Sequence, residues 1–154
     1  MLKVGDIAPS FCAANQDDVE ICSRDLAGKW IVLYFYPKDL TPGCTTEACD
    51  FTDKHSFFDD LDAVVIGVSP DDTEKHRKFI DKYDLTITLL SDETKKICQD
   101  FGVWQLKKFM GKEFMGVVRS TFIINPEGKI AAFWDKVSVR KTKSVKGLGN
   151  SCGV

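Results

Sequence analysis

Short apolar runs alternate with amphipathic stretches along most of the chain. Runs rich in β-branched and aromatic residues predict buried strands at residues 30–36, 63–69, 86–90, 117–124 and 129–134. Periodicity and capping residues predict helices over about residues 43–60, from residue 69 onward, and over residues 92–101. Because strands alternate with helices and a hairpin follows, the pattern predicts an α/β fold with a mixed central sheet flanked by helices.

Two further segments fall outside this alternation. Strand-like runs at residues 11–14 and 19–22 flank the turn-forming residues 15–18, and they predict an N-terminal β-hairpin. Residues 104–116 (WQLKKFMGKEFMG) are apolar and aromatic, and we interpret them as a loop packed on the core. The functional alternative for that stretch is a substrate-entrance wall or a subunit contact.

Composition narrows the class of protein. A chain of 154 residues is long enough for one domain with a real core. Its 21 basic and 23 acidic residues favour neither nucleic acid nor an anionic membrane surface as a partner. Residues 1–6 lack the apolar core of a signal peptide, and no run approaches transmembrane length. The sequence therefore predicts a soluble cytoplasmic protein.

Cysteine usage does not suggest a disulfide framework, because the cytoplasm keeps most thiols reduced. The six cysteines lie at positions 12, 22, 44, 49, 98 and 152. Their spacing lacks the two close pairs of a zinc site, and the chain has only two histidines, so no metal is predicted. Outside the segment discussed next, we interpret the cysteines as small buried hydrophobic residues or exposed bystanders: Cys12, Cys22, Cys98 and Cys152.

Cys44 is the strongest candidate for chemistry. It lies in the segment PKDLTPGCTTEAC (residues 37–49), between a predicted strand and a predicted helix. Free backbone N–H groups and the helix dipole at such a junction favour a thiolate, so Cys44 is a candidate nucleophile. The hydroxyl of Thr41 either caps the same loop or hydrogen-bonds to the sulfur or to a bound oxygen, and Pro37 stiffens the loop.

A helical wheel relates Cys44 to Cys49. At about 100° per residue, Cys44 falls with Ala48 on the face toward the sheet, whereas Cys49 falls on the opposite, polar face. Five steps separate the two cysteines by roughly 7.5 Å along the axis, and a disulfide needs Cα atoms within about 7 Å. A Cys44–Cys49 bond therefore requires the start of the helix to melt. The alternative is that Cys49 is an exposed surface cysteine.

The other polar candidates are an arginine, a glutamate and two histidines. Arg119 lies within a predicted strand, where an unpaired charge is costly, and Glu47 is its expected partner. The arginine either forms a structural ion pair or activates the Cys44 thiolate and steadies charge on a substrate oxygen. His55 lies on the Cys44 face but about 16 Å along the helix. We interpret His55 as a core histidine and His76 as a surface residue of the next helix.

The segment around Cys44 resembles the active-site signature of a known family. Residues 36–47 (YPKDLTPGCTTE) look like the peroxiredoxin pattern Pro-x-x-x-Thr-x-x-Cys. Residues 4–11 (VGDIAPSF), 65–71 (VIGVSPD) and 119–124 (RSTFII) narrow the resemblance to the bacterioferritin comigratory protein, or peroxiredoxin Q, branch. The similarity extends from about residue 2 to residue 147.

This resemblance implies a thioredoxin-like fold and a thiol peroxidase that reduces hydrogen peroxide and organic hydroperoxides. By matching position, the implied site comprises the peroxidatic Cys44, the peroxide-binding Thr41, Gly43 and Arg119, the shielding Pro37, the supporting Glu47 and the resolving Cys49. In the implied cycle Cys44 becomes a sulfenic acid, the helix unwinds locally, and Cys49 condenses with the sulfenic acid. Thioredoxin then reduces the disulfide.

The resemblance implies no metal or organic cofactor, and the protein is expected to be a monomer or a weak homodimer. Two other functions compete with the peroxidase. One is a general thiol–disulfide oxidoreductase, which is disfavoured because the chain has no C-x-x-C pair. The other is a non-enzymatic thioredoxin-fold binding or chaperone module in which Cys44 is structural.

The C-terminal end departs from the family pattern. A peroxiredoxin domain is expected over residues 1–147, after which such proteins continue into an amphipathic helix. Residues 148–154 (LGNSCGV) are instead expected to form an atypical tail, with two glycines and no helical stripe. Cys152 in this tail is a second candidate resolving cysteine.

Overall fold

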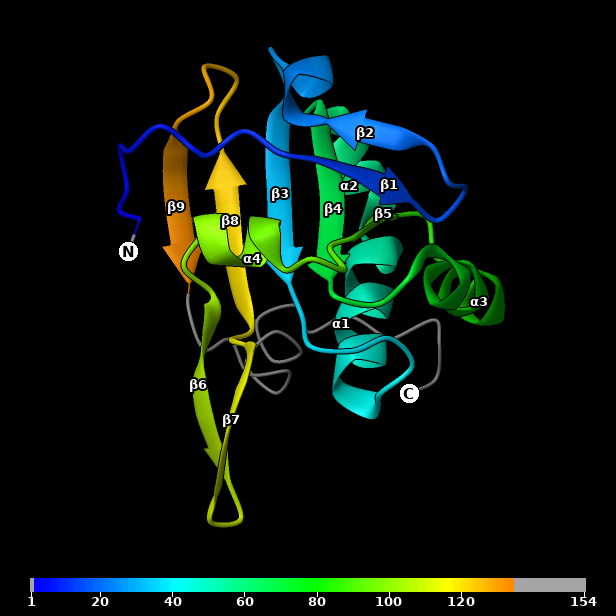
Figure 1. Cartoon of the computed structure of the whole chain (residues 1–154). Coiled ribbons are helices and arrows are strands. Elements are labelled where there is room, and N and C mark those ends of the chain that lie inside the picture. Colours follow the sequence, from blue (N-terminus) through cyan, green and yellow to red (C-terminus); the bar gives the residue numbers. More distant parts are fainter. Residues whose placement is uncertain (1, 135–154) are drawn as a thin grey trace.

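A seven-stranded mixed sheet forms the centre of the computed structural model, which describes residues 2–134 (Figure 1). Its strand order is β2-β1-β5-β4-β3-β8-β9. The strands are β1 (Cys12–Asn15), β2 (Glu20–Cys22), β3 (Trp30–Phe35), β4 (Ala63–Ser69), β5 (Thr88–Ser91), β8 (Ser120–Ile124) and β9 (Ile130–Trp134). Strands β3, β4 and β5 run parallel, whereas β1 and β8 pair antiparallel to β5 and β3. The predicted mixed sheet is confirmed.

Within residues 2–134, four short helices and one 3₁₀ turn accompany the sheet. They are η1 (Ser23–Leu26), α1 (Pro42–Asp53), α2 (His55–Asp60), α3 (Thr73–Tyr83) and α4 (Lys96–Asp100). The single helix predicted over residues 43–60 is wrong, because the chain breaks at Lys54. The Lys54 N–H donates to the Phe51 carbonyl at 3.2 Å, three residues back, so the last turn of α1 tightens before α2 begins at His55.

Alternating side chains of β3 divide the core into two layers. Ile31, Leu33 and Phe35 belong to one cluster, together with α4 residues such as Cys98. Val32 and Tyr34 belong to the other cluster, which includes the buried residues of α1 and α3. In Figure 1, α1, α2 and α3 lie behind the sheet and α4 lies in front of it. Successive strand residues point to opposite faces, so a continuous apolar run is typical of a strand covered on both sides.

The stretch predicted to be a packed loop is a β-hairpin that projects from the body (Figure 1). Strand β6 (Trp104–Phe109) pairs antiparallel with β7 (Lys112–Val117). Met110 and Gly111 form its two-residue turn with positive φ angles of 52° and 80°, the geometry that matches the twist of paired strands. Met110 is 85 % exposed, so the prediction of core packing was wrong at the tip of this hairpin.

The predicted N-terminal hairpin is confirmed as β1 and β2, and it carries an unexpected disulfide. Cys12 lies directly opposite Cys22 in the β1–β2 register, with a Cα–Cα distance of 4.0 Å, and their sulfurs are bonded. The interpretation of these two cysteines as bystanders was therefore wrong. The sequence placed the two cysteines near each other but not opposite, because a turn at residues 15–18 would pair position 12 with 21; Asn15 instead pairs with Val19, which brings Cys12 opposite Cys22.

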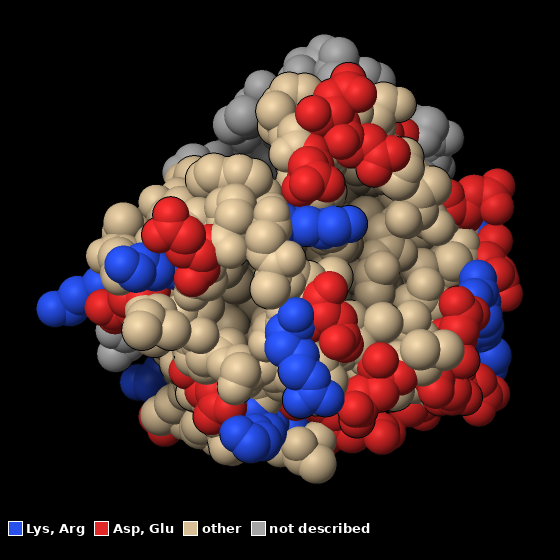
Figure 2. Space-filling model, turned by 90° about the horizontal axis from the view of Figure 1, so that it is seen from above, with Lys and Arg blue, Asp and Glu red and all other residues tan. Residues whose placement is uncertain are grey.

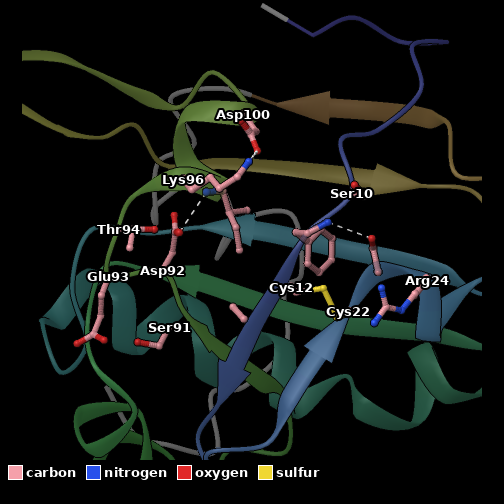
Figure 3. Close-up of a pocket in the computed structure, with 14 residues that line it drawn as sticks. Ser10, Cys12, Cys22, Arg24, Ser91, Asp92, Glu93, Thr94, Lys96 and Asp100 are labelled. Atoms are coloured by element: carbon pink, nitrogen blue, oxygen red, sulfur yellow. Dashed lines mark hydrogen bonds and ion pairs between the residues drawn. A yellow bond between two sulfur atoms is a disulfide. The ribbon is translucent and has the colours of Figure 1, made fainter.

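Figure 3 shows this disulfide at the wall of a cavity of about 460 Å³ that lies between the hairpin, η1 and α4. The carboxylate of Glu20 lies with the two sulfurs in a group whose ligand atoms are within 4.8 Å of one another. Because the sulfurs are bonded to each other, they are not thiolate ligands in this state. Cys44 does not line this cavity.

Charges of both signs are interspersed on the face of the molecule seen in Figure 2, in keeping with the balanced composition. Within residues 2–134, no helix is long and apolar enough to cross a membrane. The predicted domain end at residue 147, the tail at residues 148–154 and Cys152 lie outside the described residues.

Candidate active site

Cys44 lies in the first turn of α1, where the chain has just left β3. Thr41 is the N-cap residue of this helix, with extended backbone angles (φ −84°, ψ 151°), and Pro42 follows at the first helical position. Proline is favoured there because it has no N–H to leave unpaired and its φ suits a helix. Cys44 is 2 % exposed, so its sulfur lies in a nearly dry environment at the positive end of the helix dipole.

Arg119 reaches Cys44 from the connection between β7 and β8. Its guanidinium donates a hydrogen bond to the Cys44 sulfur at 3.0 Å and another to the Glu47 carboxylate at 2.6 Å. The expected pairing of Arg119 with Glu47 is therefore present, and the same side chain also contacts the candidate nucleophile. Glu47 lies one turn after Cys44 in α1, so a single guanidinium spans both groups.

The charges of this cluster support one another. Burial by itself would lower the pKa of Arg119, but the negative charges of Glu47 and Cys44 raise it above its usual value. The Glu47 side chain is 1 % exposed, and a carboxylate so deeply buried needs a partner. Arg119 therefore stays protonated and presents a fixed positive charge to the sulfur.

Three other predicted site residues precede Cys44 in the loop and the first turn of α1. The hydroxyl of Thr41 donates to the carbonyl of Lys38 at 2.9 Å, which is the loop-capping arrangement. That hydroxyl keeps acceptor capacity for another group, since an oxygen has two lone pairs. Pro37, Thr41 and Gly43 are all partly exposed, so they form the side of the site that solvent reaches.

The helical wheel predicted that Cys49 lies on an exposed, polar face of the helix, but it does not. It is fully buried and belongs to the same core cluster as Cys44, Ala48 and Phe51. The prediction was wrong because residues 44–51 of α1 are buried all round the helix, so this segment has no polar face. The wheel assigned faces from polarity, but Glu47 and Asp50 are buried as well.

Both histidine interpretations were wrong, and in opposite directions. His55 has a side chain that is 52 % exposed and lies 3.3 Å from Asp59, because the break at Lys54 removes it from the wheel of α1. His76 in α3 is fully buried. Its ring contacts the side chain of Asp39 at 2.5 Å, in the loop before Cys44. Sequence reasoning missed this pair, although an aspartate beside the active-site motif was a signal to look for a partner.

Comparisons with known proteins identify the family of this chain. The family model for AhpC/TSA matches residues 4–133. A protein named peroxiredoxin Bcp from Bacillus subtilis is 52 % identical over 139 residues, 90 % of this chain and 88 % of that protein. Peroxiredoxin Bcp of Escherichia coli is 43 % identical over 134 residues, 87 % of this chain and 86 % of that protein.

Solved structures show the same fold. The bacterioferritin comigratory protein of Xanthomonas campestris, studied for its alkyl peroxide reduction activity, superposes with a TM-score of 0.84 at 35 % identity, covering 96 % of this chain and 94 % of that one. The peroxidoxin BcpB of Mycobacterium tuberculosis gives a TM-score of 0.82 at 31 % identity, with 94 % of each chain covered. The expected thioredoxin-like fold is confirmed, and the chain belongs to the AhpC/TSA family, in its peroxiredoxin Bcp branch.

Proposed function

We propose that this peroxiredoxin reduces hydrogen peroxide and organic hydroperoxides with Cys44 as the attacking thiolate. One observation carries the assignment of the residue. The Cys44 sulfur is buried at a helix start and receives a hydrogen bond from the Arg119 guanidinium at 3.0 Å. Alkyl peroxide reduction by the Xanthomonas campestris relative supports the choice of substrate class.

The first step is a nucleophilic displacement at the O–O bond. The Cys44 thiolate attacks the terminal oxygen of the peroxide, and a new S–O bond forms as the O–O bond breaks. The sulfur is oxidised to a sulfenic acid, while the leaving oxygen takes a proton and departs as water or an alcohol. Arg119 is placed to stabilise the negative charge that moves from sulfur to oxygen, and Glu47 holds the guanidinium in position.

Peroxide binding uses the open side of the site. Thr41 and the backbone of Gly43 face the partly exposed entrance and are proposed to hold the peroxide oxygens. Pro37 is proposed to exclude water from the sulfur. A dry site strengthens the interaction between the guanidinium and the developing oxyanion.

In its thiol form, Cys49 is the proposed resolving residue. It condenses with the Cys44 sulfenic acid, releasing water and forming a disulfide, and thioredoxin or a similar dithiol returns both cysteines to thiols. Because Cys49 is buried five residues further along α1, this step requires the first turns of the helix to open. The cytoplasm, which supplies such dithiols, is the proposed compartment.

The decisive test follows NADPH consumption in the presence of thioredoxin, thioredoxin reductase and hydrogen peroxide. The parent protein is expected to consume NADPH, and Cys44→Ser is expected to abolish this activity. Cys98→Ser is the matched control, because Cys98 is also a buried thiol but lies in α4. NADPH consumption by Cys44→Ser at the parental rate would overturn the role of Cys44, and a parent protein that consumes none would leave the binding-module alternative.

Peptide mass mapping after one equivalent of peroxide tests the resolving step separately. We expect a Cys44–Cys49 disulfide in the parent, and a sulfenic acid that over-oxidises readily in Cys49→Ser. A bond between Cys44 and Cys152, or between two subunits, would contradict the role of Cys49 without affecting that of Cys44.

A further inference from the structure

Asp39, in the loop between β3 and α1, is held by groups from three other parts of the fold. The Tyr36 hydroxyl, just after β3, donates to one of its carboxylate oxygens. The other oxygen contacts His76 of α3 at 2.5 Å. The backbone N–H of Asp39 donates to the carboxylate of Asp71, which follows β4, at 2.6 Å. Asp39 is 4 % exposed, so these bonds are shielded from water.

His76 is the centre of this arrangement. Its ring is fully buried, and Nε2 donates to the carbonyl of Leu90 in β5 at 2.9 Å. That bond leaves Nδ1 to share a proton with the Asp39 carboxyl. The imidazole therefore links the Cys44 loop to β5, which lies on the far side of β4 from β3. A histidine with both nitrogens occupied in the core is a rigid connection.

The loop that Asp39 anchors is the one that presents the reactive groups. Thr41 is two residues further along, and its carbonyl accepts the N–H of Thr45 at 2.9 Å in the first turn of α1. Leu40, between Asp39 and Thr41, has a positive φ of 63°, a strained conformation for a residue with a bulky side chain. Such a loop keeps its shape only when its neighbours are fixed, and the bonds of Asp39 fix it.

We propose that His76 is a positioning residue for the peroxide reaction: it holds Asp39, and Asp39 holds the loop that sets Thr41 and the start of α1. This inference rests on the proposed peroxidase function. His76 does not contact the Cys44 sulfur or the site of the peroxide; it acts through the geometry of the loop. Misplacement of reacting groups by about 1 Å can cost on the order of 10²-fold in rate.

Two substitutions of His76 separate its two bonds. The amide of His76→Asn can replace Nδ1 and donate to Asp39, whereas the amide of His76→Gln can replace Nε2 and donate to Leu90. Each variant loses one buried hydrogen bond. The rate constant for peroxide reduction, measured by stopped flow on the reduced protein, should fall at least about tenfold in His76→Gln and by less than about threefold in His76→Asn. The apparent KM for thioredoxin should stay unchanged in both.

Asp92→Asn is the matched control for lost stability. Asp92 is 4 % exposed, and its carboxylate accepts the backbone N–H groups of Ile97 and Cys98 in α4 rather than a group of the loop that holds Cys44. This variant should unfold more readily while its peroxide rate constant stays parental. Asp39→Asn is the second test variant if His76→Gln does not fold, and it should show the same loss of rate.

Three results would overturn the role of His76. They are a parental peroxide rate in the folded His76→Gln or Asp39→Asn variant, equal losses in His76→Gln and His76→Asn, or an equal loss in Asp92→Asn. If the parent protein does not consume peroxide, the proposed function itself fails. That outcome is distinct from the three results above, in which the parent is active.

Discussion

Cys44 and Cys98 are two buried thiols with opposite electrostatic surroundings. Cys44 is 2 % exposed and Cys98 is fully buried, and each lies in a helix that packs on the central sheet. The Cys44 sulfur contacts the guanidinium of Arg119 at 3.0 Å. Burial raises the pKa of the Cys98 thiol, and a hydrogen bond to Asp92 and the negative charge of Asp92 raise it further.

The comparison shows that burial alone does not make a cysteine reactive. Burial disfavours the charged form of the Cys98 thiol. The Cys44 sulfur instead contacts a cation, Arg119, which is itself kept protonated by Glu47. The acid near Cys98 serves a different purpose, since Asp92 accepts N–H groups at the start of α4. The neighbouring charge therefore distinguishes the thiol that we propose as the nucleophile from Cys98.

The largest expected difference between the two thiols is in their reaction with peroxide. When the reduced protein is exposed to hydrogen peroxide in the presence of a sulfenic acid trap, Cys44 should be labelled at least about 10³ times faster than Cys98, since only a thiolate attacks the O–O bond. Mass spectrometry of the peptides measures the ratio. Similar labelling of both residues in folded protein would mean that the charge of Arg119 does not matter.

Arg119→Met should remove most of this advantage while keeping the apolar stem of the side chain. The peroxide rate constant is expected to fall about 10²-fold, the usual cost of losing one donor to a developing oxyanion. Arg77→Met is the control, because Arg77 forms an ion pair with Asp81 on the exposed face of α3. A stopped-flow series on the two variants checks this, and parental kinetics in Arg119→Met would refute the proposed role of the cation.

The smallest expected effect concerns stability at high pH and belongs to Cys98. Because its pKa is raised in the folded state, the unfolded chain loses this proton first, above the ordinary thiol pKa of about 8.5. The stabilising contribution is fully present below that pH and is lost as pH rises. The free energy of unfolding should therefore fall by up to about 1.4 kcal/mol per pH unit from this group.

Urea titrations of the parent and Cys98→Ala between pH 8 and pH 10 measure this contribution. The variant is less stable at every pH because it leaves a cavity, but its stability should depend less steeply on pH. Parallel curves for the two proteins would show that Cys98 ionises equally in the folded and unfolded states.

Local patterns predicted the elements and the reactive segment of this protein. The apolar runs identified β3 and β4, and the junction of strand and helix identified Cys44, because both signals depend on neighbours in the chain. The partnership of Arg119 with Glu47 was also predictable, since a charge in an apolar run needs a counter-charge, although Arg119 lies between β7 and β8 and not inside a single strand as predicted.

Predictions failed where the outcome depended on distant parts of the fold. A helical wheel reports polarity, but it does not show which faces of α1 the surrounding elements cover, so Cys49 was assigned to the wrong face. His55 and His76 have the same side chain, and only tertiary contacts decided that the first is exposed and the second is buried with Asp39.

By itself the sequence determined which residue types stand at the helix start and how strands alternate with helices, because those are properties of neighbouring residues. Only the tertiary structure decided which charge meets which thiol. Arg119 and Cys44 are 75 residues apart, as Asp39 and His76 are 37 apart. Their contacts arise because neighbouring strands of the sheet bring separate loops together: β8, antiparallel to β3, follows Arg119, and β4, parallel to β3, leads to His76. Coulomb interactions then act over the few ångströms between side chains.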